Sequence, residues 1–525
     1  MSLLAPIRPL TPPGSRRRRW LPALLATTAL VATSGLVGTS PAQADEPVTA
    51  LGPTVTKTNL PPTGYEVTIR YKNDGASRVQ IAPEMTFSDP SLIKSATESE
   101  TKPGSQWEPG DVPAIKLAGD GAGWTVYEMT KGADGIWSYT SPLPSGTFNY
   151  ALLVNCASDT GAGCTRIPDP ANPVWNADDV GGPNRQVYVP GDPSYGTLDK
   201  SYEAPVDEDE AGSLQHVRYP STSTAGTQGL TIYTPPGYNP NRSTAYPTLY
   251  LSHGAGGDEY DWANSGVAGN ILDNALADGR MQPAVVVMTN FNGIPGGTAG
   301  YATELTTKVI PYVQKNFNVS RRASDRAFGG LSAGGARSAY LLYNNTDTFA
   351  YYGIWSINSG GTPTEAQLAK MKEVEIVHSG TGLQDWLANI TTGSQARDAL
   401  LKSLGVNVLS FNQPGIHSWD IWRMELNDYL RRVAFKATTT NLTVAQKSKG
   451  KVKVTAKVVA DARTSTVSPT GRVQFLLDGK PVGAPLSLTG KNVSVTLTAA
   501  PGQQITAVYS GNQLFNGSTR VVTVS

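Results

Sequence analysis

The chain has 525 residues, a formal net charge of +1 at pH 7 and only 16% charged residues. Its length is enough for roughly three domains. The near-neutral balance excludes the strongly basic surface of a nucleic-acid-binding protein, and we expect no nucleic-acid partner. The 54 glycines, 38 prolines and 10 tryptophans are typical of an extracellular, turn-rich protein with β modules.

The first 44 residues have the three parts of a secretory signal peptide. Four arginines occupy 16–19, an apolar run follows at 21–37, and the small-residue site Ala-Gln-Ala lies at 42–44. A membrane anchor is the alternative, but no stop-transfer pattern flanks the run and no later apolar run could span a bilayer. We therefore predict a cleaved signal peptide and a secreted protein, with attachment to the cell surface left open. The arginines also leave the twin-arginine export route open.

Residues 45–190 are predicted to form an all-β sandwich. Period-two alternation at 65–71 and 124–129 predicts strands, which glycine and proline separate. Segments 135–150 and 168–173 resemble the early-set β-sandwich related to glycogen-binding modules. This resemblance implies a carbohydrate-module-like domain of the kind that often precedes esterases.

The cysteines and tryptophans of this module lead to two further predictions. Cys156 and Cys164 are the only cysteines, and in an exported chain they are predicted to form a local disulfide. No further metal ligands lie near them at zinc-binding spacing. Trp124, Trp137 and Trp175 offer either a sugar-stacking face or a packed core, and the bulk of tryptophan favours the core.

Residues 213–436 follow a predicted linker at 191–212, whose acidic run at 207–210 is expected to be solvated. Strands alternate with helices over 213–436, which predicts an α/β sheet, and the apolar strands are expected to be buried on both faces. Eight strands with a serine turn after the fifth are the α/β-hydrolase arrangement. The expected strands are residues 215–219, 230–233, 248–252, 284–288, 326–329, 353–356, 375–377 and 407–411.

Residues 437–525 are rich in Thr, Val, Ser and Gly and predict a second all-β sandwich of immunoglobulin-like size. Segments 469–475 and 507–512 resemble the bacterial immunoglobulin-like repeat of surface and secreted proteins. We find no catalytic constellation in this sequence and expect it to be a spacer or a surface attachment. The predicted fold class is therefore α/β, with an α/β-hydrolase central domain flanked by two all-β sandwich domains.

The candidate nucleophile is Ser332, in the motif Gly330-x-Ser332-x-Gly334. This motif is typical of the nucleophile elbow, a sharp strand-to-helix turn whose glycines let strand and helix pass close beside the serine. A glycine-rich surface turn is the alternative, because 54 glycines can produce the pattern by chance. The context favours the elbow, since an amphipathic segment precedes it at 305–317 and apolar residues follow at helical spacing from Ala336.

A serine hydroxyl needs a base to take its proton, and the chain has four histidines. In α/β-hydrolases the order along the chain is serine, acid, histidine, and only His417 satisfies it on a loop that follows a strand. We predict His417 as general base and general acid, with a cap on the last helix as its alternative role. His216 and His378 are expected to be structural, and His253 is expected to orient its own loop.

The segment His-Gly-Ala-Gly-Gly at 253–257 follows the predicted strand 248–252, where an oxyanion loop is expected. Glycines let backbone N–H groups approach a substrate oxygen without an intervening Cβ. The expected donors are the amides of Ala255 and Ala333, which stabilise charge that forms only in the tetrahedral state.

The catalytic acid is predicted to be Asp385, the carboxylate in the loop after the seventh strand. Three other carboxylates are alternatives with weaker positions. Glu375 lies inside the strand, Asp398 lies in the following helix, and Asp420 is too close to His417 in sequence to reach behind it easily.

Five segments taken together resemble the Putative esterase family, which includes feruloyl esterases, acetylxylan esterases, enterochelin esterases, S-formylglutathione hydrolases and mycolyltransferases. These segments are 233–238, 249–257, 309–313, 330–335 and 415–419. Residue by residue, the resemblance implies the same nucleophile, base, acid and oxyanion donors as named above. The chain departs from the family at Ile416, where many members carry a second glycine, and in a slightly long loop at 380–385.

The resemblance implies a secreted serine carboxylesterase that hydrolyses feruloyl or acetyl esters on plant cell-wall polysaccharide through a Ser-His-Asp acyl-enzyme mechanism. This mechanism needs no cofactor and no metal, and the expected partner is an ester-bearing polysaccharide or oligosaccharide. Trp262, Trp386 and Trp419 flank the catalytic loops and are candidates either for substrate stacking or for loop packing. The alternatives are mycolyltransferase-like acyl transfer to a sugar and a non-catalytic surface-binding protein. The oligomeric state is left open.

Overall fold

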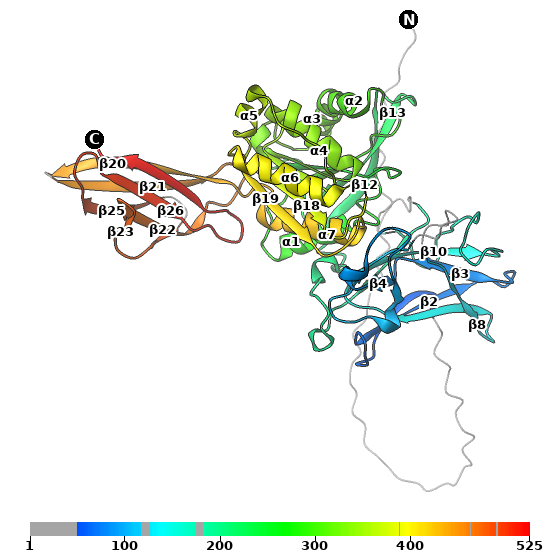
Figure 1. The fold of residues 1–525 in the computed structure, drawn as a ribbon. Helices are drawn as coiled ribbons and strands as arrows, with labels where there is room; N and C mark the ends of the chain where they lie inside the picture. The colour runs from blue at the N-terminus through cyan, green and yellow to red at the C-terminus, as the bar shows by residue number, and fades with distance from the viewer. Residues whose placement is uncertain are drawn as a thin grey trace, which may run out of the picture. The chain divides into compact units, whose positions relative to one another are not determined.

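The computed structural model describes residues 50–116, 125–174 and 182–525, except Ala388, Lys449, Arg463, Gly490 and Lys491. The predicted signal peptide at 1–44, Trp124 and Trp175 lie outside the described residues. Within the described part, every helix is too short or too polar to cross a membrane. The elements run from a β region through an α/β region to a second β region (Figure 1).

The first β region has two four-stranded sheets and a short three-stranded sheet. The first sheet has the order β1 (Gly52–Lys57), β2 (Tyr65–Lys72), β9 (Ile136–Pro142) and β8 (Thr130–Lys131). The second has the order β11 (Arg185–Val189), β10 (Gly146–Val154), β3 (Val79–Pro83) and β7 (Tyr127–Glu128). The short sheet joins β5 (Lys102–Pro103), β4 (Thr86–Ser88) and β6 (Val112–Pro113). Alternate residues Val67, Ile69 and Tyr71 of β2 are buried in the core, as the period-two pattern predicts.

Two predictions about this N-terminal sandwich are confirmed. Cys156 and Cys164 form a disulfide with an S–S distance of 2.08 Å. Trp137 is buried in the core, and its indole Nε1 donates a hydrogen bond to the carbonyl oxygen of Asn73 at 3.2 Å. Trp137 therefore packs the sandwich and offers no face to a sugar.

One eight-stranded sheet forms the centre of the α/β region, in the order β12-β13-β15-β14-β16-β17-β18-β19. The pairs β12–β13 and β13–β15 are antiparallel, and all other neighbours are parallel. This is the α/β-hydrolase order, and all eight predicted strands are present, so the predicted fold class is confirmed. The strands are β12 (Ser213–Pro220), β13 (Thr227–Thr234), β14 (Thr248–Ser252), β15 (Val285–Thr289), β16 (Arg326–Leu331), β17 (Tyr351–Trp355), β18 (Ile376–Gly382) and β19 (Val408–Gln413).

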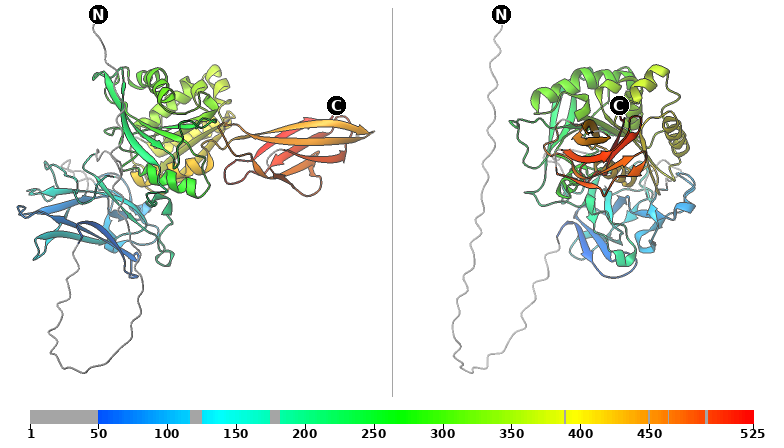
Figure 2. Two further views of the ribbon diagram at one scale, coloured as in Figure 1. Left: turned by 180° about the vertical axis from the view of Figure 1, so that it is seen from behind. Right: turned by 90° about the vertical axis from the view of Figure 1, so that its left-hand side faces the viewer.

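Helices cover both faces of this sheet (Figures 1 and 2). One core lies between the sheet and the helices α1 (Ala268–Ala277) and α7 (Trp419–Arg432). The other core contains residues of α2 (Gly297–Glu304), α3 (Ile310–Asn316), α4 (Ala333–Asn344), α5 (Glu365–Met371) and α6 (Ile390–Ser403). Leu249 and Leu251 of β14 join the first core and Tyr250 joins the second, because successive side chains of a strand point to opposite faces.

The segment between the N-terminal sandwich and this sheet packs closely over part of its length. It contains the 3-10 turns Pro193–Tyr195 and Ser201–Glu203. Lys200 and Glu203 are buried, whereas the acidic run at 207–210 is exposed, as predicted. The predicted linker at 191–212 is therefore a solvated connection only in its last part.

The second β region is also a sandwich. One sheet has the order β20 (Thr438–Ser448), β21 (Lys451–Ala460) and β25 (Asn492–Thr498). The other joins β23 (Lys480–Pro481), β22 (Thr470–Leu477), β26 (Gln504–Tyr509) and β27 (Ser518–Thr523), with β24 (Leu486–Thr489) paired to β22. Inward residues of β21 and β22, such as Val454 and Phe475, form its core.

Candidate active site

Ser332 occupies a strained turn between β16 and α4. Its backbone angles are φ 51° and ψ −117°, a region that non-glycine residues rarely adopt and that costs about 1–3 kcal/mol. The N–H of Ser332 donates to the carbonyl oxygen of Trp355 at 2.9 Å, which ties the turn to the end of β17. A Cβ at Gly330 or at Gly334 would collide with neighbouring main-chain atoms, so the close approach of strand and helix requires both glycines.

His417 and Asp385 come from two neighbouring loops at the same edge of the sheet. His417 follows β19, Asp385 follows β18, and Nδ1 of the histidine lies 2.7 Å from Oδ2 of the aspartate. The second carboxylate oxygen of Asp385 accepts the N–H of Leu387 at 3.0 Å. The Asp385 side chain is 0% exposed and that of His417 is 15% exposed. A buried carboxylate therefore holds a ring that remains partly open to solvent.

The carboxylates weighed as alternatives to Asp385 have other positions or partners. Asp420 forms an ion pair with Lys200. Asp398 pairs with Arg397 at 3.2 Å, and Glu375 lies at the opposite end of β18 from Asp385.

Gln384 connects the loops of His417 and Asp385, and sequence reasoning missed it. Its side-chain Oε1 accepts the N–H of Gly415 at 2.8 Å, and its own N–H donates to the carbonyl oxygen of Gly415 at 2.9 Å. Gly415 has φ 145°, which favours glycine at this point of the loop. Two features of the sequence could have indicated this connection. Gln384 is a polar residue directly before the predicted acid, and Gly415 lies two residues before the predicted base.

A chain of contacts joins the histidine loop to the serine turn. The His417 ring packs edge-on against Trp422, with centroids 5.1 Å apart. The indole Nε1 of Trp422 donates to Oγ of Ser356 at 3.0 Å. Ser356 directly follows Trp355, whose carbonyl oxygen accepts the N–H of Ser332. Both loops are thus fixed to the carboxyl end of β17.

The glycine loop after β14 lies directly against the nucleophile. A Cβ built on Gly254 would lie 3.5 Å from Cβ of Ser332, in ordinary contact, and 2.8 Å from Cδ1 of Leu331, so a larger residue would have to displace the Leu331 side chain. Ala255 is exposed in this loop, and Gly256 has φ 78°. Ala333 is the first residue of α4, where N–H groups point out of the helix and have no acceptor within it.

His253 holds the glycine loop as a neutral imidazole. Its Nδ1 lies 2.7 Å from the carbonyl oxygen of Gly254, which can only accept, so Nδ1 carries the hydrogen. Its Nε2 accepts the N–H of Phe291 at 3.4 Å, and the two rings stack 3.9 Å apart. Burial lowers the pKa of His253 to about 4. The ring therefore fixes the loop without adding charge to it.

The two remaining histidines have structural partners. His216 lies 3.0 Å from Glu259 and stacks on Tyr260 with ring centroids 4.8 Å apart. His378 is fully buried within β18, and burial lowers its pKa.

The three tryptophans predicted as substrate contacts have different environments. Trp262 is 1% exposed, its Nε1 donates to the carbonyl oxygen of Ser252 at 3.1 Å, and its ring meets Trp355 edge-on at 5.7 Å. The prediction of a substrate contact is therefore wrong for Trp262, which packs the core beneath the loops. Trp419 is half-buried against Trp262, at 5.4 Å. Trp386 is half-buried next to Asp385 in the chain.

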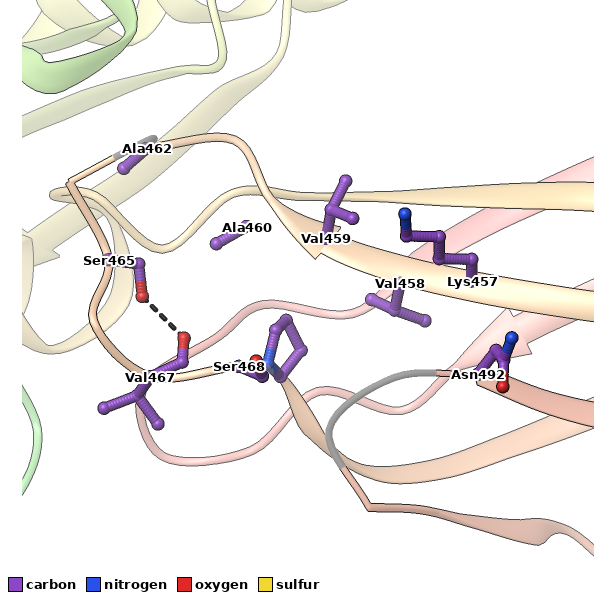
Figure 3. Close-up of a pocket in the computed structure, with 10 residues that line it drawn as sticks. Lys457, Val458, Val459, Ala460, Ala462, Ser465, Val467, Ser468 and Asn492 are labelled. Atoms are coloured by element: carbon purple, nitrogen blue, oxygen red, sulfur yellow. Dashed lines mark hydrogen bonds between the residues drawn. The ribbon is translucent and has the colours of Figure 1, made fainter.

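The described residues hold no cluster of three or more His, Cys, Asp or Glu side chains that could bind a metal ion. A pocket in the C-terminal sandwich is also a poor candidate for catalysis (Figure 3). Its lining includes Lys457, Ser465 and Asn492 but neither a histidine nor a carboxylate, and the Ser465 hydroxyl is bonded to the carbonyl oxygen of Val467 at 2.7 Å. Among the described residues, the His417–Asp385 pair and the Ser332 turn lie at the same edge of the central sheet, after β19, β18 and β16.

Comparison with known proteins finds similarity in the α/β region. Residues 221–433 match the family described as Putative esterase. An endo-1,4-beta-xylanase/feruloyl esterase of Xylanibacter ruminicola is 28% identical over 323 residues, which are 59% of this chain and 41% of that protein. Endo-1,4-beta-xylanase Y of Acetivibrio thermocellus is 32% identical over 154 residues, which are 27% of this chain and 14% of that protein.

A solved structure is also similar to part of this chain. The feruloyl esterase module from Clostridium thermocellum, in complex with sinapinate, is 26% identical, with a TM-score of 0.40. The match covers 44% of this chain and 91% of that one. The chain thus spans most of that module but less than half of each xylanase relative.

Proposed function

We propose that this chain is a secreted serine carboxylesterase that removes feruloyl or acetyl groups from plant cell-wall polysaccharide, since its residues 221–433 match the Putative esterase family. The observation that carries the proposal is the 2.7 Å contact between His417 Nδ1 and Asp385 Oδ2, on loops tied to the same strand end as Ser332. A hydroxyl, an imidazole and a buried carboxylate from three separate segments are the parts that acyl transfer through a serine requires.

In the first half of the reaction, Oγ of Ser332 attacks the ester carbonyl carbon while Nε2 of His417 takes the hydroxyl proton. Asp385 accepts a hydrogen bond from Nδ1, which fixes the tautomer and stabilises the imidazolium. The carbonyl oxygen becomes an oxyanion and accepts hydrogen bonds from the amides of Ala255 and Ala333, each worth about 3 kcal/mol in the transition state. The intermediate collapses, the bond to the alcohol oxygen breaks, and His417 protonates that oxygen.

In the second half, water attacks the acyl-enzyme. His417 takes a proton from the water as the new bond forms, and the second oxyanion uses the same two amides. When this intermediate collapses, Ser332 recovers its proton from His417 and the free acid leaves. The neutral state of His253 suits the loop, because a protonated Nε2 could no longer accept the N–H of Phe291.

The substrate class rests on the relatives and on the site. The relatives named above include a xylanase joined to a feruloyl esterase, which supports esters carried by xylan. Trp386, half-buried beside Asp385, is the aromatic side chain we propose for stacking on the acyl group. The predicted signal peptide at 1–44 supports secretion, and substrates of this kind lie outside the cell.

A fluorophosphonate probe and a panel of esters test the proposal. We expect the probe to label the folded chain and the Ser332→Ala variant to lose both labelling and turnover while retaining its fold. The panel contains methyl ferulate, acetylated xylan, 4-nitrophenyl acetate and a long-chain ester offered with trehalose. Preferential hydrolysis of methyl ferulate or acetylated xylan supports the proposal. Ester formed on trehalose would indicate a transferase, and the absence of labelling would indicate a binding protein.

A further inference from the structure

Two charged side chains lie at the start of the helix that follows His417. Helix α7 begins at Trp419, and its first five residues carry Asp420 and Arg423. Arg423 is 1% exposed, and the side chain of Asp420 is 12% exposed. Charges removed from water in this way need partners, because an unpaired buried charge is strongly destabilising.

Arg423 finds its partners in segments that are far apart in the sequence. Its Nε and Nη2 donate to the carbonyl oxygen of Ser265, at 2.9 and 2.5 Å, just ahead of α1. Its Nη1 donates to the carbonyl oxygen of Thr147, at 2.6 Å, in strand β10 of the N-terminal sandwich. The same Nη1 lies 3.8 Å from Oε2 of Glu203. Arg423 therefore binds the catalytic domain, the sandwich and the linker together.

Glu203 completes the junction from the linker side. Its carboxyl group is fully buried, and Oε2 accepts the N–H of Thr147 at 2.8 Å. The N–H and the carbonyl oxygen of Thr147 are thus both held by this pair of opposite charges. Asn270 of α1 in turn donates from Nδ2 to the carbonyl oxygen of Glu203 at 3.0 Å.

A second ion pair supports the same helix start. Lys200 of the linker pairs with Asp420, and the Lys200 side chain is 8% exposed. A small cavity beside these pairs is lined by Glu84 of the sandwich and by Ile416 and Ser418. These last two residues are the direct neighbours of His417, so the base loop itself faces the sandwich.

We propose that Arg423 is a positioning residue for His417, and that the N-terminal sandwich holds the base loop in place through Thr147 and Glu203. This proposal rests on the proposed function, in which His417 is the general base. The sandwich then belongs to the catalytic unit and is not a detachable module. Releasing the start of α7 would displace the imidazole, and a shift of about 1 Å is enough to cost about 10²-fold in rate.

The test compares the full chain with Arg423→Met, which keeps much of the side-chain volume and removes the charge. Active sites are counted by fluorophosphonate labelling to completion, and kcat is expressed per labelled site on methyl ferulate and 4-nitrophenyl acetate. We expect kcat per site to fall about 10- to 100-fold, KM to stay nearly constant, and the acid limb of the pH–rate profile to move. Fewer labelled sites with unchanged kcat per site would mean that Arg423 only packs, and would overturn the proposal.

Two further variants keep the test decisive if Arg423→Met does not fold. Lys200→Met weakens the same junction at a less buried point and is expected to lower kcat per site about 3- to 10-fold. Lys102→Met is the matched control, because Lys102 pairs with Asp111 at 2.8 Å inside the sandwich. Equal kcat per site in the Lys200 and Lys102 variants would overturn the proposal.

The rate constant of fluorophosphonate labelling separates this proposal from the proposed function. Labelling depends on the base but needs no ester turnover. A parent chain that is labelled but hydrolyses none of the esters would refute only the proposed substrate. Labelling at equal rates in the parent and Arg423→Met would refute the positioning role.

Discussion

The α/β region contains two His–Asp pairs whose comparison shows what a catalytic imidazole requires. In one pair His378 Nε2 lies 2.9 Å from Oδ2 of Asp428, and in the other His417 Nδ1 lies 2.7 Å from Oδ2 of Asp385. The contacts are nearly equal in length. The His378 side chain is 0% exposed and that of His417 is 15% exposed.

The difference lies in what the second ring nitrogen meets. Nδ1 of His378 accepts a hydrogen bond from the indole Nε1 of Trp355 at 2.8 Å, so both nitrogens of this ring are occupied. His378 lies within strand β18, whereas His417 lies on a loop beyond β19 and turns only Nδ1 toward its carboxylate. The strand position buries His378 and gives both of its ring nitrogens a partner. The loop position of His417 can leave one ring nitrogen for a substrate.

The same substitution in the two carboxylates should have very different effects on turnover. We expect Asp385→Asn to lower kcat by about 10³- to 10⁴-fold, because the amide no longer holds the productive tautomer of His417. The matched variant Asp428→Asn should change kcat per labelled site by less than about 3-fold, since His378 takes no part in the reaction. Kinetics on 4-nitrophenyl acetate measure both effects. Similar losses of kcat in the two variants would contradict the assignment of a catalytic role to the His417–Asp385 pair alone.

For stability we expect the opposite order: removing His378 should destabilise the protein more than removing His417. His378→Ala leaves a cavity and a buried Trp355 N–H without its acceptor, while Asp428 keeps only Arg432, and we expect it to lower the free energy of unfolding by about 4 kcal/mol. His417→Ala removes a partly exposed ring and should cost about 1 kcal/mol. Urea-induced unfolding followed by tryptophan fluorescence gives both values. An equal loss for His417→Ala would show that its loop is as structural as the strand.

The buried histidines should also make stability depend on pH in a defined direction. Burial lowers the pKa of His253 to about 4, below the value near 6.5 of an unfolded chain. The unfolded state therefore binds more protons between these values, so the stabilisation is complete above about pH 6.5 and is lost as the pH falls toward 4. We expect a loss of up to about 3 kcal/mol from this residue.

The pKa of His378 is shifted in the same direction by burial, and it should add to the loss. Denaturation midpoints at pH 7, 5.5 and 4.5 measure the trend, and His253→Asn should flatten it. Burial raises the pKa of Asp261 and that of Glu375 to about 7, which favours the folded state at low pH in both chains, so the result is the difference between the parent and His253→Asn. Equal pH trends in the two chains would contradict the neutral state of His253.

Much of the fold followed from local pattern. Strand β14 begins and ends at the residues predicted for it, because an apolar run between polar turns marks a buried parallel strand. The nucleophile turn could be predicted because it requires a glycine two residues before and a glycine two residues after Ser332. The position of His417 followed from the order of the family's catalytic residues, which depends on the connectivity of the sheet.

Other features could not be predicted because they depend on partners far away in the chain. The sequence left Trp262 open between substrate stacking and loop packing, and its packing depends on Trp355 and Trp419, which are more than ninety residues away. Lys200 and Glu203 were assigned to the linker at 191–212, and charged residues of such a segment are usually exposed. Their burial depends on Asp420 and on other groups that follow about two hundred residues later.

The bond from Arg423 to Thr147 joins a side chain to a carbonyl oxygen, an atom that every amino acid carries. The residue at 147 can therefore mutate without breaking this bond, provided that the strand keeps its path. For the same reason, an analysis of sequence covariation between related chains would not detect the bond between Arg423 and residue 147. The pairs Lys200–Asp420 and Arg423–Glu203 each join two side chains, and they are the parts of the junction from which coordinated evolutionary change is expected.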